Sequence, residues 1–169
     1  MTDNKNREVE PATRDFTSIG KFIVTFSQIE LIIRILLSKT LKIKEEHFNA
    51  VIGSYDFSML CRVTATIFKR EFPERKAEVD KVFKQCLALN DDRVRIAHAS
   101  WTYETGRFAA RHLSRQSLKQ TFYYQRPDEL EQVNETAQQL MNDVLTLFAT
   151  IFQRPPQGAD MDAKQGGNL

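Results

Sequence analysis

The chain is poor in glycine, cysteine and histidine, and each shortage excludes or disfavours a class of protein. Six glycines in 169 residues provide no glycine-rich loop of the kind that cradles phosphates. The two cysteines, Cys61 and Cys86, fall in apolar helical patterns and predict small buried side chains, with one interhelical bridge as the alternative. The three histidines are widely separated in the sequence, so we expect neither a bound metal nor another cofactor.

A long apolar run and a dominant charge of one sign are also missing. No stretch reaches the ~18 apolar residues that a membrane-spanning helix needs, and the polar first residues do not resemble a signal peptide. We therefore expect a cytoplasmic protein without membrane association. The 24 lysines and arginines face 22 acidic residues, so any nucleic-acid site must be a local patch.

Apolar residues recur at three- and four-residue steps through most of the chain, which is typical of helices with one buried face. The second of four helical regions is broken at Gly53 and Ser54, and Asp56 or Ser58 is the expected cap of its longer part. Aromatic residues and threonines between the last two regions predict a small hairpin or an extended loop. The four helical regions span about 15–41, 44–72, 73–100 and 128–153, and the hairpin or loop spans 101–125.

This order of elements predicts an all-α fold, an antiparallel four- to five-helix bundle with a small hairpin or loop inserted before the last helix. The helical domain is expected over residues 13–154. The polar segments 1–12 and 155–169 are expected to be disordered tails.

Polar residues interrupt the apolar arc of the third predicted helix. At about 100° per residue, Asn90 and Arg93 fall inside an arc that also holds Val94 and Ala97. Removing water from a guanidinium is costly unless partners replace it, so this position of Arg93 needs an explanation. His98 falls at the edge of the arc, about 140° from Arg93.

Each of these residues also has a purely structural interpretation. Arg93 is a possible partner for Glu30, which lies close to the apolar face of the first helix, in a buried ion pair. His98 is favoured near a helix C-terminus by the helix dipole. Taken singly these interpretations are the better ones. Taken together with Asn90, and with Asp91 and Arg95 beside His98, the residues favour a functional site.

The segment LNDDRVRIAHASW resembles the signature of the HEPN family, in which an Arg is followed by a His near the end of a helix. Arg93 and His98 supply this pair with four residues between them. The segment FIVTFSQIELIIRILL resembles the first helix of the family, and the order of helices fits over about residues 15–153. The sequence departs from the family at Val94, where a polar residue is usual, and Asn90 or Asp91 lies one turn earlier for a similar role.

The resemblance implies a metal-independent endoribonuclease, of toxin or defence type, that cuts RNA through attack by the ribose 2′-OH. His98 is then the group that exchanges protons near neutral pH, and Arg93 donates hydrogen bonds to the phosphate oxygens, with Arg95 adding charge. The two side chains point in different directions on one helix. The family brings the motif helices of two protomers together, so a homodimer is expected.

Two other functions remain open, namely a non-catalytic module that binds nucleotide or RNA and a protein-interaction element beside a nucleotidyltransferase. HEPN toxins with such an antitoxin partner often carry a Tyr two residues after the His, and this chain has Ser100 there, which argues against that subgroup. A basic and aromatic RNA contact is an alternative to an ordinary solvated hairpin between the last two helices. Its residues are Arg107, Arg111 and Arg115, interleaved with aromatics that include Phe122, Tyr123 and Tyr124.

Overall fold

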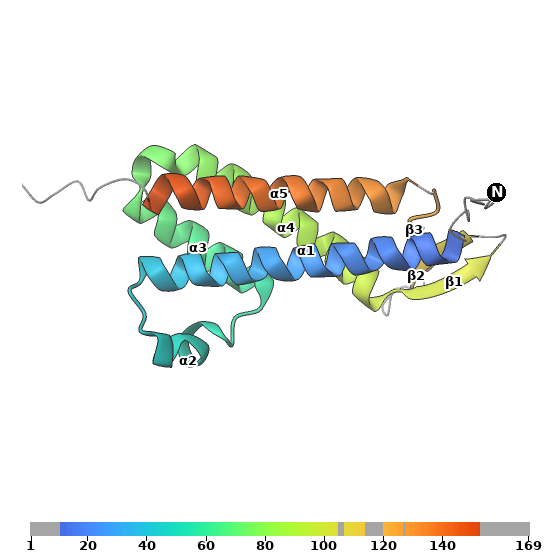
Figure 1. The fold of residues 1–169 in the computed structure, drawn as a ribbon, viewed down its shortest axis with the longest axis horizontal. Coiled ribbons are helices and arrows are strands. Elements are labelled where there is room, and N and C mark those ends of the chain that lie inside the picture. Colours follow the sequence, from blue (N-terminus) through green and yellow to red (C-terminus); the bar gives the residue numbers. More distant parts are fainter. Residues whose placement is uncertain (1–10, 105–106, 114–119, 127, 153–169) are drawn as a thin grey trace, which may run out of the picture.

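The computed structural model describes residues 11–104, 107–113, 120–126 and 128–152. These residues form five α-helices, two single-turn 3-10 helices and one three-stranded antiparallel sheet (Figure 1). The helices are α1 (Pro11–Thr40), α2 (Phe48–Ile52), α3 (Phe57–Glu71), α4 (Lys76–His98) and α5 (Glu129–Phe152). The strands are β1 (Ser100–Glu104), β2 (Arg107–Leu113) and β3 (Gln120–Tyr123), in the order β1-β2-β3.

The mostly helical character of the chain is confirmed, but a purely α-helical fold is wrong. Residues 100–123 contribute three paired strands instead of a hairpin or loop, with Trp101 opposite Ala110 and Ala110 opposite Tyr123. Aromatic and β-branched side chains favour this pleated, half-buried arrangement. The first helix begins at Pro11, so residues 11 and 12 of the predicted tail belong to it, while 1–10 and 155–169 lie outside the described residues.

The break between α2 and α3 lies at the predicted place, and Asp56 is the cap. Its carboxylate accepts a hydrogen bond from the backbone N–H of Met59 at 2.7 Å, which satisfies one of the unpaired donors at the start of α3. Ser58 is therefore not needed as a cap, and its hydroxyl is available to another helix.

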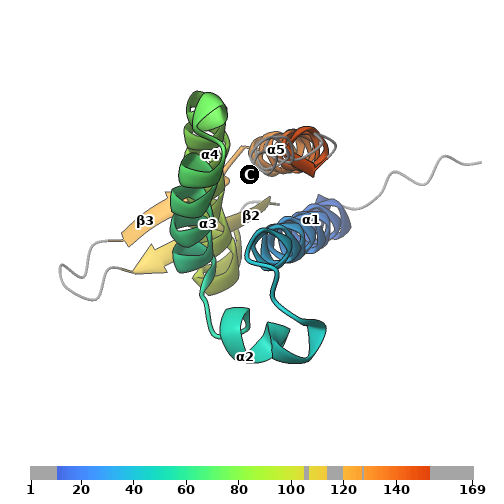
Figure 2. The same cartoon turned by 90° about the vertical axis from the view of Figure 1, so that its left-hand side faces the viewer.

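Helices α1 and α5 lie side by side and run in the same direction (Figures 1 and 2). Near their starts, Asn134 Nδ2 donates to the carbonyl oxygen of Ser18 at 3.0 Å, and near their ends Lys39 Nζ lies 5.1 Å from the Phe148 ring centroid. This parallel pair departs from the predicted antiparallel bundle. The reason is that residues 41–56 turn back along α1, so that Phe57 at the start of α3 packs on Phe26 in the middle of α1. Helix α3 then runs in the same direction as α1, α4 runs the opposite way, and α5 returns parallel to α1 (Figure 1).

The core lies between α1, α3, α4 and α5 and consists of phenylalanines and aliphatic side chains. Cys61 and Cys86 are buried in it without a disulfide bond, as the sequence predicted. A hydrogen bond with Cys86, and then burial, raises the pKa of Cys61, so this thiol stays protonated. Among the described helices, none is long and apolar enough to cross a bilayer. Fully buried members of the core include Phe22, Ile29, Ile33, Phe68, Val79 and Leu147.

Candidate functional site

The last two turns of α4 are only partly covered, although earlier turns of the same helix face the core. Val82 and Cys86 are buried, whereas Arg93 on the same side is half-buried and Val94 and Ala97 are exposed. The predicted place of Val94 and Ala97 in a buried arc is therefore wrong. The cause is the position of α3, which runs antiparallel to α4. Because α3 begins at Phe57, beside Asn90, it does not extend far enough to cover the end of α4.

Asn90 marks the point where α3 stops covering α4. Its Nδ2 atom donates a hydrogen bond to Ser58 Oγ, in the first turn of α3, at 3.2 Å. At the other end of this helix pair, Lys69 Nζ lies 2.8 Å from Asp80 Oδ1. Residues of α4 beyond Asn90 therefore extend past the start of α3, and this leaves the side of the helix that carries Arg93 open.

Neither Arg93 nor His98 forms a hydrogen bond or ion pair with any residue that the structure describes. A half-buried guanidinium has five N–H donors and has already lost part of its water, so an anion is a favourable partner. His98 is exposed, and Asp91, two turns earlier on the same stripe, is also exposed. Five positions separate Arg93 from His98, which places their side chains about 140° apart around one helix.

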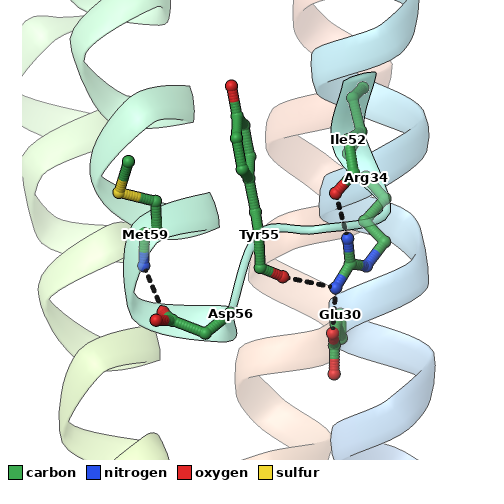
Figure 3. Close-up of polar contacts among 6 residues, drawn as sticks. All are labelled: Glu30, Arg34, Ile52, Tyr55, Asp56 and Met59. Atoms are coloured by element: carbon green, nitrogen blue, oxygen red, sulfur yellow. Dashed lines mark hydrogen bonds and ion pairs between the residues drawn. The ribbon is translucent and has the colours of Figure 1, made fainter. Parts of the chain in front are cut away.

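The predicted ion pair between Glu30 and Arg93 is wrong, because Glu30 pairs within its own helix. Glu30 Oε1 accepts a hydrogen bond from Arg34 Nη2 at 2.6 Å (Figure 3). The Arg34 guanidinium also donates to the carbonyl oxygens of Ile52 and Tyr55, the latter at 2.8 Å. The sequence contained this signal, since Glu30 and Arg34 stand four residues apart on one helix. Glu30 therefore supports the fold next to α3 and does not contact Arg93.

Arg95 lies on the other side of α4 from Arg93 and joins the helix to the sheet. Its Nη1 atom lies 3.1 Å from Asp92 Oδ1, and its guanidinium stands 5.0 Å from the ring centroid of Tyr123. Asp92 Oδ1 also accepts a hydrogen bond from the Tyr124 hydroxyl at 3.2 Å. Burial, and then the charge of Asp92, raises the pKa of Tyr124, so its phenol remains a hydrogen-bond donor.

Of the three arginines proposed for a hairpin RNA contact, the structure describes the side chain of Arg111 alone. Arg111 is exposed on β2, in register with Ser100 of β1 and Phe122 of β3. Arg107 belongs to β2, but its side chain lies outside the described part, and Arg115 lies outside the described residues altogether. Whether these three side chains lie close together therefore stays a prediction.

A hollow of about 580 Å³ lies between the end of α4, strand β3 and the first turns of α5. Its lining includes Arg95 and Arg126 together with the aromatic residues Phe122, Tyr123 and Tyr124. From the sequence, these aromatics were grouped with the arginines of the hairpin. The structure places them beside Arg95 and α5, which no spacing in the sequence indicates, while Phe122 also lies opposite Arg111 in the sheet.

Across the described residues, no three histidine, cysteine, aspartate or glutamate side chains lie close enough together to hold a metal ion. Comparison with known proteins gives no match to a family model, to a curated protein or to a solved structure. The end of α4 and the adjoining hollow bring basic, titratable and aromatic side chains together at one end of the molecule.

Proposed function

We propose that the protein is a HEPN-type, metal-independent endoribonuclease of the toxin or defence class, whose active site is completed by two copies of the chain. The proposal rests on one observation: a half-buried arginine that has no acceptor among the described residues lies about one and a half turns from an exposed histidine at the end of one helix. Arg93 supplies donors for a phosphate, and His98 supplies a group that exchanges protons near neutral pH.

The proposed reaction is an internal transfer of the phosphate. The ribose 2′-oxygen attacks the adjacent phosphorus and loses its proton to one imidazole, while the bond from phosphorus to the 5′-oxygen breaks and that oxygen takes a proton from a second imidazole. The products are a 2′,3′-cyclic phosphate and a 5′-hydroxyl. The guanidinium of Arg93 stabilises the extra negative charge that develops on the phosphate oxygens.

Two copies of the chain are needed because Arg93 and His98 point in different directions on α4. A two-fold axis beside this helix end brings two arginines and two histidines into one cleft. Apolar surface at the same place supports such a contact. Val94 is 38% exposed and Met59, which follows Ser58 in the first turn of α3, is 50% exposed. Burying these side chains against a second copy removes apolar area from water.

Cleavage can be tested with the purified full chain, mixed RNA and EDTA. We expect cleavage in EDTA, resistance of RNA whose 2′-OH is blocked, and a loss of about 100- to 10,000-fold in rate for His98→Ala, the range for a missing proton-transfer group. His47→Ala is the matched control, because its side chain is 61% exposed and far from α4 in the sequence. Full cleavage by the His98→Ala protein, or strict dependence on added Mg²⁺, contradicts the proposal.

Dimerisation can be tested separately by sedimentation at micromolar concentration. We expect a dimer that Val94→Glu converts to a monomer, because a carboxylate buried without a partner in an interface is costly. Val51→Glu provides the control, since Val51 is 43% exposed on α2, away from α4. A wild-type chain that sediments as a monomer excludes the shared active site.

A second candidate function is a HEPN-like module that binds RNA or nucleotide without cutting it. The observation in its favour is that Val94 follows Arg93, where the HEPN family usually has a polar residue. Asn90, one turn earlier, already donates to Ser58. The two candidates separate in the cleavage assay, because a binding module retains RNA and leaves it intact. An association with a nucleotidyltransferase antitoxin is disfavoured for either candidate, because Ser100 stands where toxins with such a partner often carry Tyr.

A further inference from the structure

The hollow beside Arg95 has the size and the lining of a site for one nucleotide. Its volume of about 580 Å³ falls within the ~300–1,000 Å³ that is usual for small-molecule sites. Aromatic rings, guanidinium groups and an amide meet there, and such groups bind the face, the phosphate and the edge of a nucleotide respectively. The residues that contribute these groups to the lining are Phe122, Tyr123, Arg95, Arg126, Glu129 and Gln132.

The aromatic side of the hollow offers surfaces for stacking. Phe122 is 39% exposed, although phenylalanine is normally covered by other side chains. The Arg95 guanidinium lies over the Tyr123 ring at 5.0 Å from its centroid, so a cation already rests on the face of an aromatic ring at the wall. Any of the four bases can stack on these aromatic side chains, because every base has a π-face.

The lining of the hollow carries one more positive charge than negative, and each of its arginines keeps donors beyond its ion pair for a phosphate. Two arginines, Arg95 and Arg126, line it against one carboxylate, Glu129, and the carboxylate is paired to Arg126 at 2.9 Å. The side chain of Arg126 is 70% exposed and stands at the rim, where a phosphate remains in contact with water. Arg95 is held by Asp92, so its orientation is fixed before a ligand arrives.

Neither His98 nor Arg93 lines the hollow, but His98 is the nearer of the two to Arg95 around the helix. Arg95 precedes His98 by three positions, so their side chains are neighbours on the helix surface, with roughly 5–6 Å between Cβ atoms. Arg93 lies about 160° around the helix from Arg95. When one phosphate of a nucleic-acid strand lies at His98, the nucleotide adjacent to that phosphate is therefore the one placed at the hollow.

From these relations we infer that the hollow binds a base of single-stranded RNA that flanks the phosphodiester at His98. The identity of the strand as RNA rests on the proposed function, but binding in the hollow does not require cleavage. A strand anchored by one stacked base presents the neighbouring phosphate to His98 in a fixed register. The hollow thus selects unpaired RNA, because a base in a duplex is not available for stacking on Phe122 or Tyr123.

The single tryptophan of the chain provides a signal for binding. The rings of Trp101 and Tyr124 are stacked, with centroids 6.0 Å apart, and Tyr124 lines the hollow. Short single-stranded oligoribonucleotides of one base type are titrated into the full-length His98→Ala protein, so that the RNA stays intact. Trp101 fluorescence then gives the dissociation constant, and a double-stranded RNA of equal length tests the selection for unpaired bases.

Phe122→Ala is the first test, and Phe152→Ala is its control. Both phenylalanines are 39% exposed, but Phe152 lies at the other end of α5, beside Phe148. Because one base–aromatic stack is lost, we expect the dissociation constant to rise about tenfold for Phe122→Ala and to stay unchanged for Phe152→Ala. Circular dichroism shows whether each variant is folded.

Gln132→Glu is the second test, and it does not depend on the folding of β3. It places a carboxylate in the hollow, whereas Gln139→Glu places one on α5 outside the lining residues. The control is closely matched, because Gln132 and Gln139 each donate an amide hydrogen bond to an aspartate four residues away, at 2.7 and 2.9 Å. We expect weaker RNA binding for Gln132→Glu alone.

The outcomes separate this inference from the proposed function. Weaker binding by Phe122→Ala and Gln132→Glu, with both controls unchanged, supports the site in the hollow. Unchanged binding by these two variants, or no RNA binding at all, overturns it. If the wild-type chain nevertheless cleaves RNA, the endoribonuclease stands and the hollow is not its base site. If RNA binds in the hollow and is never cut, the nuclease proposal fails and the hollow remains a binding site.

Discussion

Two arginines interrupt the apolar faces of two helices, and their surroundings differ. The Arg34 side chain is 16% exposed, and its guanidinium donates to Glu30 and to two backbone carbonyl oxygens (Figure 3). Arg93 is half-buried on α4 and has no acceptor among the described residues. Arg34 therefore holds the fold together, whereas Arg93 keeps its donors free of the described residues and, under the proposed function, offers them to a phosphate.

The two regions are also connected. Arg34 fixes the segment from Ile52 to Tyr55, and Asp56 then caps α3 directly after it. The position of this cap places Ser58 against Asn90 and leaves the rest of α4 uncovered. The ion pair on α1 therefore determines where the open face around Arg93 begins.

Of the changes that test this comparison of two arginines, Arg93→Ala is expected to have the largest effect. RNA cleavage should fall by about 100- to 1,000-fold, as for the loss of one donor that stabilises transition-state charge. Thermal stability should change little, because no hydrogen bond or ion pair within the described residues is lost. Arg93→Lys should restore only part of the rate, since an ammonium cannot donate two parallel hydrogen bonds. A large drop in melting temperature for Arg93→Ala would make Arg93 a structural residue like Arg34.

Arg34→Met should have the opposite pattern. We expect the free energy of unfolding to fall by about 3 kcal/mol, because Glu30 and two backbone carbonyls lose their donor. Glu30→Gln should cost less, about 1 kcal/mol, since the amide oxygen still accepts from Arg34. Urea denaturation gives these values, and Arg62→Met, on the exposed side of α3, is the control. Equal stability of Arg34→Met and Arg62→Met refutes the role of Arg34.

The smallest expected effect is on stability at alkaline pH, and it concerns Tyr124, which donates to Asp92 beside Arg95 on the other side of α4 from Arg93. Burial and the charge of Asp92 raise the pKa of Tyr124 in the folded protein. The unfolded chain therefore loses this proton first, at a pH of about 10, and stability declines from there upward. Tyr124→Phe should decline less steeply over the same pH range in chemical denaturation. Identical slopes would mean that Tyr124 is not held in its protonated form.

Local features were well predicted from the sequence. The break at Gly53 and the cap at Asp56 follow from residues close together in the chain, because both depend on backbone geometry within one turn. The apolar stripe of α1 predicted its buried face, including Phe26 and Ile33. Helix periodicity also located Arg93 and His98 on different sides of α4 without any tertiary information.

Features that depend on distant residues were predicted less well. The partner of Glu30 was sought on another helix, although Arg34 satisfies it within the same one. Val94 is exposed because α3 begins too late to cover it, and no pattern within the third helix encodes that distance. The hollow requires β3 and α5 to meet beside Arg95, an arrangement that follows from the whole fold.

The pairing of α1 with α5 has a consequence for how the protein is made. Helix α1 packs more extensively on α5 than on any other element of the described chain, and α5 ends at Phe152. At ~5–20 residues per second, a ribosome needs on the order of ten seconds to add the residues between these helices. During that time Phe22 and Ile29 of a nascent chain lack their final cover, so the interval exposes them to chaperones and to aggregation.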